Sequence, residues 1–116
     1  MARPTLTDLV EAAARITQYS TDDIRGPRRV RPLARVRQAV IWLAWDRGTG
    51  PISLTEIGRR LSSRDHASIC YSVRVAEEMI KRDLHFAMLV TEISAVAQRA
   101  VDARVRKVTE ALDAAA

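Results

Sequence analysis

The chain of 116 residues is 47% hydrophobic and 28% charged, which excludes a disordered segment and suits one domain with one core. Only 4% of it is aromatic and Cys70 is the single cysteine, so the core must be mostly aliphatic and no internal disulfide can form. The formal net charge is +5, but residues 25–64 hold ten arginines against two carboxylates, a concentrated positive field that a phosphate-lined partner selects.

Helical periodicity with few strand-favouring runs predicts an all-α protein. The first helix is predicted from Leu6 to Gln18, with Thr5 or Thr7 as its cap, and a single capped turn is predicted around Ser20. Glycine and proline in the following stretch, "RGPRRVRP", break regular structure. They are therefore expected to leave four arginines on a loop or arm: Arg25, Arg28, Arg29 and Arg31.

A third helix is predicted from Leu33 to Asp46, with Trp42 in the core. The glycines and the proline of residues 48–51 are expected to end it. Its predicted buried stripe is Val36, Val40, Leu43 and Ala44.

Two shorter predicted helices follow, and their arrangement is typical of a helix-turn-helix. Ser53 and Glu56 form an S-x-x-E capping box that opens a helix of about two turns, in which Gly58 permits close approach of another helix. Ser62 and Ser63 are expected to break the chain and cap the next helix, predicted from Arg64 to Lys81. The predicted inward residues of the pair are Leu54, Ile57, Leu61, Ile69, Val73, Ala76 and Ile80.

A long amphipathic helix is predicted beyond Asp83. Its apolar stripe is longer than a small core needs, so it is expected to pack along the first helix or to pair with a second copy in a homodimer. Residues 1–85 are accordingly interpreted as the helix-turn-helix domain and residues 86–116 as a helical extension. The predicted stripe is Phe86, Leu89, Val90, Ile93, Ala97, Ala100, Val101, Val108 and Leu112.

The polar run at residues 64–68 allows several chemical interpretations. Asp65, His66 and Ser68 cannot form a hydrolytic triad, because residues one and two apart on a helix point in different directions. His66 and Cys70 share a helical face, but two ligands do not make a zinc site. No phosphate-binding glycine loop is present. We therefore expect no enzyme activity, no metal and no cofactor.

A helix presented to DNA accounts for all these residues, because side chains at the start of such a helix reach base edges in the major groove. Asp65 could accept from cytosine, His66 could donate to guanine, and Ala67 could contact a thymine methyl. Ser68 could contact a base or a phosphate. For Asp65, an equally good alternative is a carboxylate that only stabilises the start of the helix.

The stretch "SLTEIGRRLSSRDHASICYSVRVAEEM" resembles the C-terminal DNA-binding domain of the bacterial replication initiator DnaA family. The family reads close to S-L-P-E-I-G followed by G-R-D-H-T-T, and the likeness is gapless over residues 53–79. It continues upstream through "ARVRQAVIWLA" and, more loosely, into the first helix. The resemblance implies an all-α helical bundle, with the long C-terminal helix added to it.

The resemblance also implies roles for individual residues. Arg35 matches an arginine that enters the minor groove, and Arg37 matches a position near phosphates. Thr55 replaces a proline, Ala67 and Ser68 replace two threonines, and Tyr71 replaces a histidine, so a shifted DNA preference is expected. The residues expected to contact DNA are Arg28, Arg29, Arg31, Arg35, Arg37, Ser53, Leu54, Thr55, Arg64, Asp65, His66, Ala67, Ser68 and Tyr71.

The expected function is sequence-specific binding of double-stranded DNA by a transcriptional regulator, for example an activator of phage-like or gene-transfer-agent genes, with RNA polymerase or a regulatory protein as partner. Only five residues precede the first helix, so the initiator's ATPase module is not expected here. One alternative is an accessory factor that binds replication origins, and another is a non-specific nucleoid or packaging adaptor. No apolar run is long enough for a membrane span and no secretion signal is visible, so a cytoplasmic, nucleoid-associated protein is expected.

Overall fold

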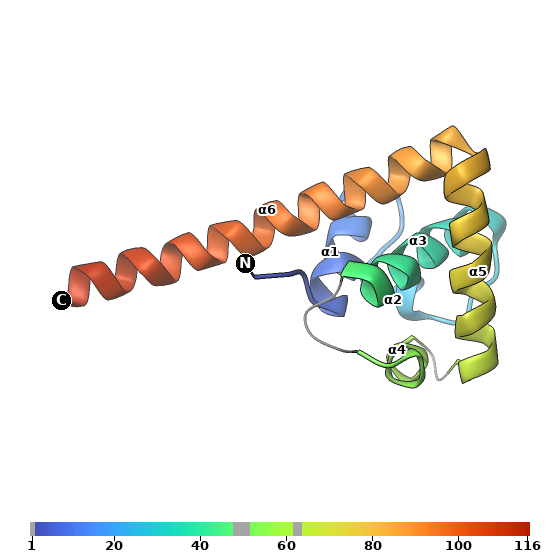
Figure 1. The fold of residues 1–116 in the computed structure, drawn as a ribbon, viewed down its shortest axis with the longest axis horizontal. Helices are drawn as coiled ribbons and strands as arrows, with labels where there is room; N and C mark the ends of the chain where they lie inside the picture. The colour runs from blue at the N-terminus through green and yellow to red at the C-terminus, as the bar shows by residue number, and fades with distance from the viewer. Residues whose placement is uncertain (1, 48–51, 62–63) are drawn as a thin grey trace.

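The computed structural model describes residues 2–47, 52–61 and 64–116, and these residues form helices joined by short connections (Figure 1). The predicted all-α fold class is confirmed. None of the described helices is long and apolar enough to cross a bilayer. In chain order the helices are α1 (Leu6–Ile16), α2 (Thr21–Arg25), α3 (Arg31–Arg47), α4 (Leu54–Arg60), α5 (His66–Arg82) and α6 (Leu84–Ala115).

Reciprocal caps fix the starts of α1 and α2. The Thr5 hydroxyl accepts from the backbone N–H of Asp8, whose carboxylate accepts in turn from the N–H of Thr5. Ser20 and Asp23 form the same box for α2, which confirms the predicted capped turn. The first helix ends at Ile16, two residues before the predicted end, because extended Thr17 turns its hydroxyl back onto the carbonyl of Ala13.

The loop predicted around the arginine-rich stretch is shorter than expected. Arg25 closes α2 and Arg31 opens α3, so placing these two on a loop was wrong. Pro32 does not interrupt α3. Proline lacks a backbone N–H, but in the first turn of a helix this N–H would have no partner within the helix. Arg28 and Arg29 do lie in the connection between the two helices.

One aliphatic core joins α1, α3, α5 and α6. The four residues predicted as the stripe of α3 are all buried, whereas Trp42 is only partly buried and packs against the edge of the core. The predicted division between residues 85 and 86 lies at the start of α6, and the two sides share this core. Its largest fully buried side chains are Leu9, Val10, Ile24, Leu33, Val40, Ile41, Leu43, Ile57, Leu61, Ile69 and Ile93.

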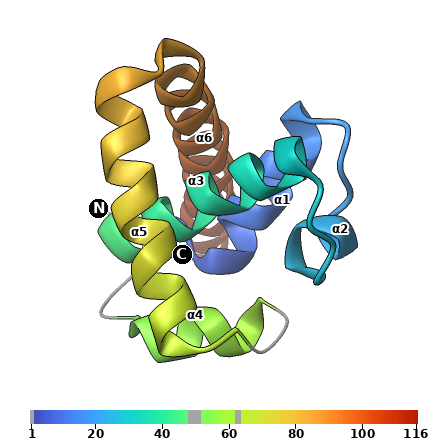
Figure 2. The ribbon, with the colours of Figure 1, turned by 90° about the vertical axis from the view of Figure 1, so that its right-hand side faces the viewer.

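The two helices α4 and α5 form the predicted helix-turn-helix, with α4 lying across the N-terminal end of α5 (Figure 2). Only the serine half of the predicted capping box is present, because both carboxylate oxygens of Glu56 accept from Arg59 instead. The helix α5 begins at His66 and is capped by Asp65, so the predicted start at Arg64 and a serine cap were wrong. The break expected at Ser62 and Ser63 lies outside the described residues.

The long helix α6 packs along α1 and then extends past the body of the molecule (Figure 1). A bidentate pair joins the two helices, since Arg104 donates to both carboxylate oxygens of Asp8 at 2.9 and 3.0 Å. The predicted stripe is buried from Phe86 to Val101, although Leu89 and Ala100 are only partly covered, whereas Val108 and Leu112 are exposed.

Candidate nucleic-acid interface

The turn between α4 and α5 depends on a close backbone contact at Gly58. The carbonyl of Gly58 accepts from the N–H groups of Leu61 and Arg64, at 3.2 and 2.8 Å. A Cβ atom on Gly58 would lie 2.1 Å from the carbonyl oxygen of Arg64, so only glycine fits here without a shift of the backbone. Close approach of another helix was predicted at Gly58; the nearest atoms belong to the backbone of Arg64, just before α5, and the side chain of Ile69 in α5 follows.

The first turn of α5 presents its polar side chains outward. Asp65 caps the helix by accepting from the N–H of Ser68 at 2.7 Å, which confirms the role in stabilising the helix start. This bond and a second one from the Ser68 hydroxyl hold the pKa of Asp65 below its usual value. His66, Ala67 and Ser68 are exposed, and one turn further on Tyr71 is 64% exposed. These four residues form an outward face at the start of α5.

His66 and Cys70 lie together, as their helical spacing predicts, with the Cys70 sulfur 3.5 Å from Nδ1 of His66. Across the described part of the chain, no group of three or more histidine, cysteine, aspartate or glutamate side chains is arranged to hold a metal ion.

A hollow of about 500 Å³ separates the start of α5 from α3, and we call it the α3–α5 hollow. It brings together many of the predicted residues from three segments of the chain. The described side chains that line it include three arginines and no carboxylate. The lining residues are Arg29, Ala34, Arg37, Gln38, Ile41, Arg64, Ala67, Ser68, Tyr71 and Ser72.

Arg37 lies inside the protein and is only 5% exposed. Its guanidinium donates to four backbone carbonyls, those of Asp23, Ile24, Gly26 and Arg28, at 2.8 to 3.0 Å. Burial, followed by the nearby charges of Arg64 and Arg29, lowers the pKa of Arg37 to about 10, so it stays charged at neutral pH. The side chain therefore organises the connection between α2 and α3.

Arg64 has a similar position on the opposite side of the same connection. It donates to the carbonyls of Leu61 and Gly26, so Gly26 accepts from both Arg37 and Arg64. Partial burial, and then the charge of Arg29, lowers the pKa of Arg64. The buried guanidinium of Arg37 and the partly buried one of Arg64 thus tie the arginine-bearing connection to the turn that precedes α5.

The other predicted arginines are more accessible. Arg28 is exposed and lies 3.8 Å from a carboxylate oxygen of Asp23, and Arg29 and Arg31 are also exposed. Arg35 is partly buried on α3 and donates to the side-chain oxygen of Gln38 at 2.9 Å. The connection and the first residue of α3 therefore provide the exposed arginines, whereas Arg35 and Arg37 further along α3 are covered.

The start of α4 carries the last three residues predicted to contact DNA. Ser53 and Thr55 are exposed, whereas Leu54 is partly buried against the core. The Ser53 hydroxyl accepts from the N–H of Glu56 at 3.0 Å and so caps the helix. The N-terminal ends of α4 and α5 thus both carry a capped, exposed first turn.

Sequence reasoning missed two features of this region. Arg74 is exposed one turn beyond Tyr71, and its spacing on α5 could have revealed it. The buried position of Arg37 also had a signal, because Leu33 and Ile41, four residues to either side, are both buried. An arginine between two core positions on the same helical face is expected to point inward.

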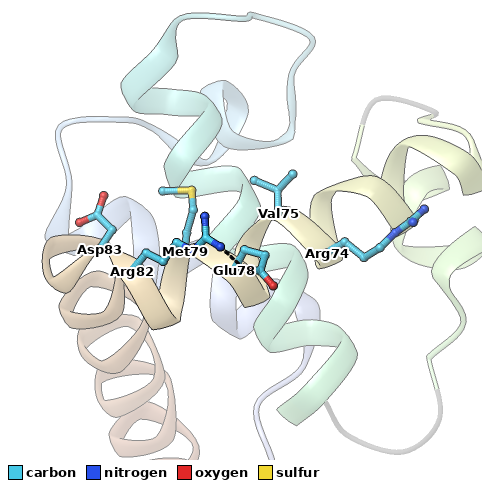
Figure 3. Close-up of a pocket in the computed structure, with 6 residues that line it drawn as sticks. All are labelled: Arg74, Val75, Glu78, Met79, Arg82 and Asp83. Carbon is cyan, nitrogen blue, oxygen red and sulfur yellow. Dashed lines mark ion pairs between the residues drawn. The ribbon is translucent and has the colours of Figure 1, made fainter.

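A second hollow, of about 350 Å³, lies on the later half of α5 (Figure 3). It is lined by Arg74, Val75, Glu78, Met79, Arg82 and Asp83, and Arg82 pairs with Glu78 at 3.5 Å. Two arginines and two carboxylates give it no net charge. It therefore lacks the positive potential of the α3–α5 hollow, and we do not include it in the candidate interface.

Comparison with known proteins identifies the arrangement. The sequence profile of the family described as "Bacterial dnaA protein helix-turn-helix" matches residues 6–75, which run from the start of α1 into α5. The chain belongs to this DnaA helix-turn-helix family. The long helix α6 lies wholly outside the matched residues.

The chromosomal replication initiator proteins DnaA of three bacteria are among its relatives. The protein of Cereibacter sphaeroides is 37% identical over 72% of this chain, and that of Caulobacter vibrioides is 38% identical over 70%. The protein of Sphingopyxis alaskensis is 35% identical over 82%. These matches cover 18%, 16% and 20% of the relatives, so the chain spans about a fifth of their length or less.

Proposed function

We propose that this protein binds double-stranded DNA, with the first turn of α5 in the major groove. The observation that carries the proposal is the outward face of His66, Ala67, Ser68 and Tyr71, which lies beside the arginine-lined α3–α5 hollow in a DnaA-type helix-turn-helix. Helix-turn-helix proteins present the start of their second helix to base edges in this way.

The charge of the hollow supports phosphate binding next to that helix. Arg29, Arg37 and Arg64 repel one another there, and their repulsion helps to lower the pKa values of Arg37 and Arg64. A phosphate at the mouth of the hollow would offset this repulsion, and Ser68, Ser72 and the Tyr71 hydroxyl could donate hydrogen bonds to it. The buried arginines would act through their field, and the exposed Arg29 through direct contact.

The structure favours a different distribution of roles from that implied by the resemblance. Arg28 and Arg29, on the connection, are better placed than partly buried Arg35 to enter a neighbouring groove or to follow the backbone. Arg37 is retained as a residue that holds the connection in place. We add Arg74 as a phosphate contact on the far side of the outward face.

The base preference is proposed to differ from that of the family. Ala67 keeps a methyl group for thymine without a hydroxyl, Ser68 keeps a hydroxyl without a methyl group, and exposed Tyr71 replaces a histidine. Asp65 remains a candidate base contact as well as the helix cap. Asp65→Ser separates the two roles, because serine caps a helix about as well as aspartate but has a shorter side chain without charge.

The proposed role is regulation of transcription, together with RNA polymerase or another regulatory protein, in the bacterial cytoplasm. The long helix α6, which lies beyond the family match, provides surface for such a partner. A second candidate is an accessory factor that occupies initiator sites at replication origins, since the relatives are replication initiators.

The test is selection of bound duplexes from a randomised library at about 150 mM salt, close to physiological ionic strength. A sharp motif is expected. A motif that differs from the initiator box would favour the transcriptional regulator, and a motif that matches it would favour the origin-binding factor. Asp65→Ser and Tyr71→Ala are expected to alter the motif, while Arg28→Ala lowers affinity for all sequences. Equal enrichment of all sequences would contradict base readout and would indicate a nucleoid or packaging role.

A further inference from the structure

The C-terminal end of α6 carries an apolar stripe that no described part of the same chain covers. Val101 is buried, and Val105, Val108 and Leu112 follow it at helical spacings of four, three and four residues. These three side chains are exposed, Leu112 by 67%. They lie where α6 extends beyond the body of the molecule (Figure 1). A contiguous exposed stripe of this kind marks an interaction surface.

A groove of about 790 Å³ runs along an earlier part of the same helix, and we call it the α6 groove. Outside α6, the groove is lined by five apolar residues and by one residue of each charge: Pro4, Leu9, Trp42, Leu43 and Ile80, with Arg3 and Asp46. The indole nitrogen of Trp42 is buried and has no hydrogen-bond partner among the described residues. Such an unpaired buried donor is costly to the free chain.

The groove and the exposed stripe lie on one face of α6. The groove is lined by Ala87, Val90, Ser94 and Gln98 of this helix, and the buried Val101 joins them to the exposed stripe. Residues three and four apart lie on the same side of a helix, and an apolar series at these spacings is the seam of a coiled coil. The series here is Ala87, Val90, Ser94, Gln98, Val101, Val105, Val108 and Leu112, which is apolar except at Ser94 and Gln98.

We propose that two copies of this chain associate through α6, antiparallel, with the exposed stripe of each copy in the α6 groove of the other. A two-fold axis near Val101 would place Leu112 opposite Thr91 of the second copy, and Val105 opposite its Gln98. The same surface is then used by both copies, as a two-fold interface requires.

Interface size favours this arrangement over contact between the two stripes alone. Three side chains from each copy would bury far less than the roughly 1,200–2,000 Å² of stable interfaces. With the stripe in the groove, the contact extends along α6 from Ala87 to Leu112 and occurs twice.

Sedimentation of the full chain between about 1 and 100 µM, the range of moderate affinities, tests the proposal without DNA. Leu112→Glu alters the stripe, and Ala95→Arg places a charge in the groove. Leu84→Glu is the matched control, because Leu84 is 72% exposed on the same helix and does not line the groove. Each interface variant is expected to weaken dimerisation at least tenfold, and the control to leave it unchanged. Helical content and unfolding curves establish that all variants fold.

Mixing the two interface variants provides the sharpest measurement. A mixed dimer has one intact stripe in one intact groove, so dimers are expected to reappear in the mixture although each variant alone is monomeric. Dimerisation that survives Ala95→Arg would overturn the proposal in favour of stripe-to-stripe pairing. A wild-type chain that stays monomeric throughout the range would also overturn it, and the stripe would then belong to a different protein partner. Neither result bears on DNA binding.

Discussion

Arginines of the same chain segment divide into two groups with opposite roles. Arg37 and Arg64 point inward and donate to backbone carbonyls, whereas Arg28 and Arg29 lie exposed on the connection that the inward pair holds. Each of these four arginines contributes the same single positive charge to the net charge of the chain. The comparison shows that a cluster of positive charge can consist partly of structural cations, whose field still reaches the surface while their hydrogen-bond donors do not.

The inward group exists because the connection between α2 and α3 needs donors. Two carbonyls at the end of α2, those of Asp23 and Ile24, and two in the connection, those of Gly26 and Arg28, accept hydrogen bonds from one guanidinium. Leaving such groups unpaired in a partly buried site would cost more than burying a charged side chain that satisfies them. The outward group then depends on the inward one, because the same bonds set the path of the backbone that carries Arg28 and Arg29.

The largest expected effect comes from removing the inward side chain. Arg37→Ala leaves four carbonyls without their donor and is expected to lower the free energy of unfolding by about 3 kcal/mol. Arg37→Lys is expected to lose less, because an ammonium keeps the charge but cannot reach all four carbonyls. Urea denaturation measures both. The matched control is Arg29→Ala, expected within about 0.5 kcal/mol of wild type, and an equal loss in this control would break the comparison.

Gly58→Ala tests the turn that carries the second inward arginine. The added Cβ would meet the carbonyl oxygen of Arg64 at 2.1 Å, so the turn must shift, and a loss of about 2 kcal/mol is expected. Because Arg64 precedes the start of α5, DNA affinity is expected to fall at temperatures where the variant is still folded. Thermal unfolding measures the loss of stability, and titration with DNA measures the loss of affinity. Unchanged stability would show that the turn can relax without consequence.

The outward group is tested by binding rather than by stability. Arg29→Ala is expected to weaken DNA binding by about 1–2 kcal/mol, and Arg28→Ala to reduce the salt dependence by about one unit of slope. Fluorescence anisotropy over a series of salt concentrations measures both quantities. Arg15→Ala, which removes an exposed arginine near the end of α1, is the control and is expected to bind normally. Weaker binding by all three variants would indicate a field effect of net charge alone.

The smallest expected effect concerns Arg104, which combines features of the two groups. Arg104 is exposed but pairs with the buried carboxylate of Asp8. Burial alone would raise the pKa of Asp8, but hydrogen bonds from Arg104 and Thr5 outweigh it and hold this pKa below its usual value. The resulting stability is present above the usual carboxyl pKa, near 4, and is lost as the pH falls through the lower folded value.

Asp8→Asn is expected to lower stability by about 1 kcal/mol at neutral pH and to flatten the acid side of the stability curve. Urea denaturation from neutral pH down to about pH 3 measures the slope, which covers the usual carboxyl pKa. Glu92→Gln, a change of an exposed carboxylate on α6, is the control. An unchanged slope in Asp8→Asn would show that another carboxylate is responsible for the acid sensitivity.

Local sequence patterns were sufficient to predict those structural features that depend on residues only a few positions apart. A threonine cap for α1, the capped turn of α2, most of the inward residues of α3 and α5, and Gly58 as a close-contact position were predicted from short motifs and spacing. Predictions were wrong where two side chains compete for the same hydrogen-bonding role. Asp65 rather than a serine caps α5, and Glu56 bonds Arg59 instead of completing its box.

The candidate interface was partly predictable for the same reason. The residues that open α5 were identified from their sequence, and the structure gathers most of them at one hollow. The buried role of Arg37 was not identified, because its partners are backbone carbonyls nine to fourteen residues earlier in the chain. No local pattern records which carbonyls will lack a donor once the helices pack.

The sequence by itself determined the helices, their apolar faces, the helix-turn-helix and its family, because each depends on periodicity or on a short motif. Only the tertiary structure decided which carbonyls the inward arginines satisfy, which face of α6 is covered by the body, and where that cover ends. These outcomes depend on contacts between segments far apart in the chain, such as Asp8 with Arg104. Position in the packed fold, and not residue type, separates a structural arginine from one that can meet a phosphate.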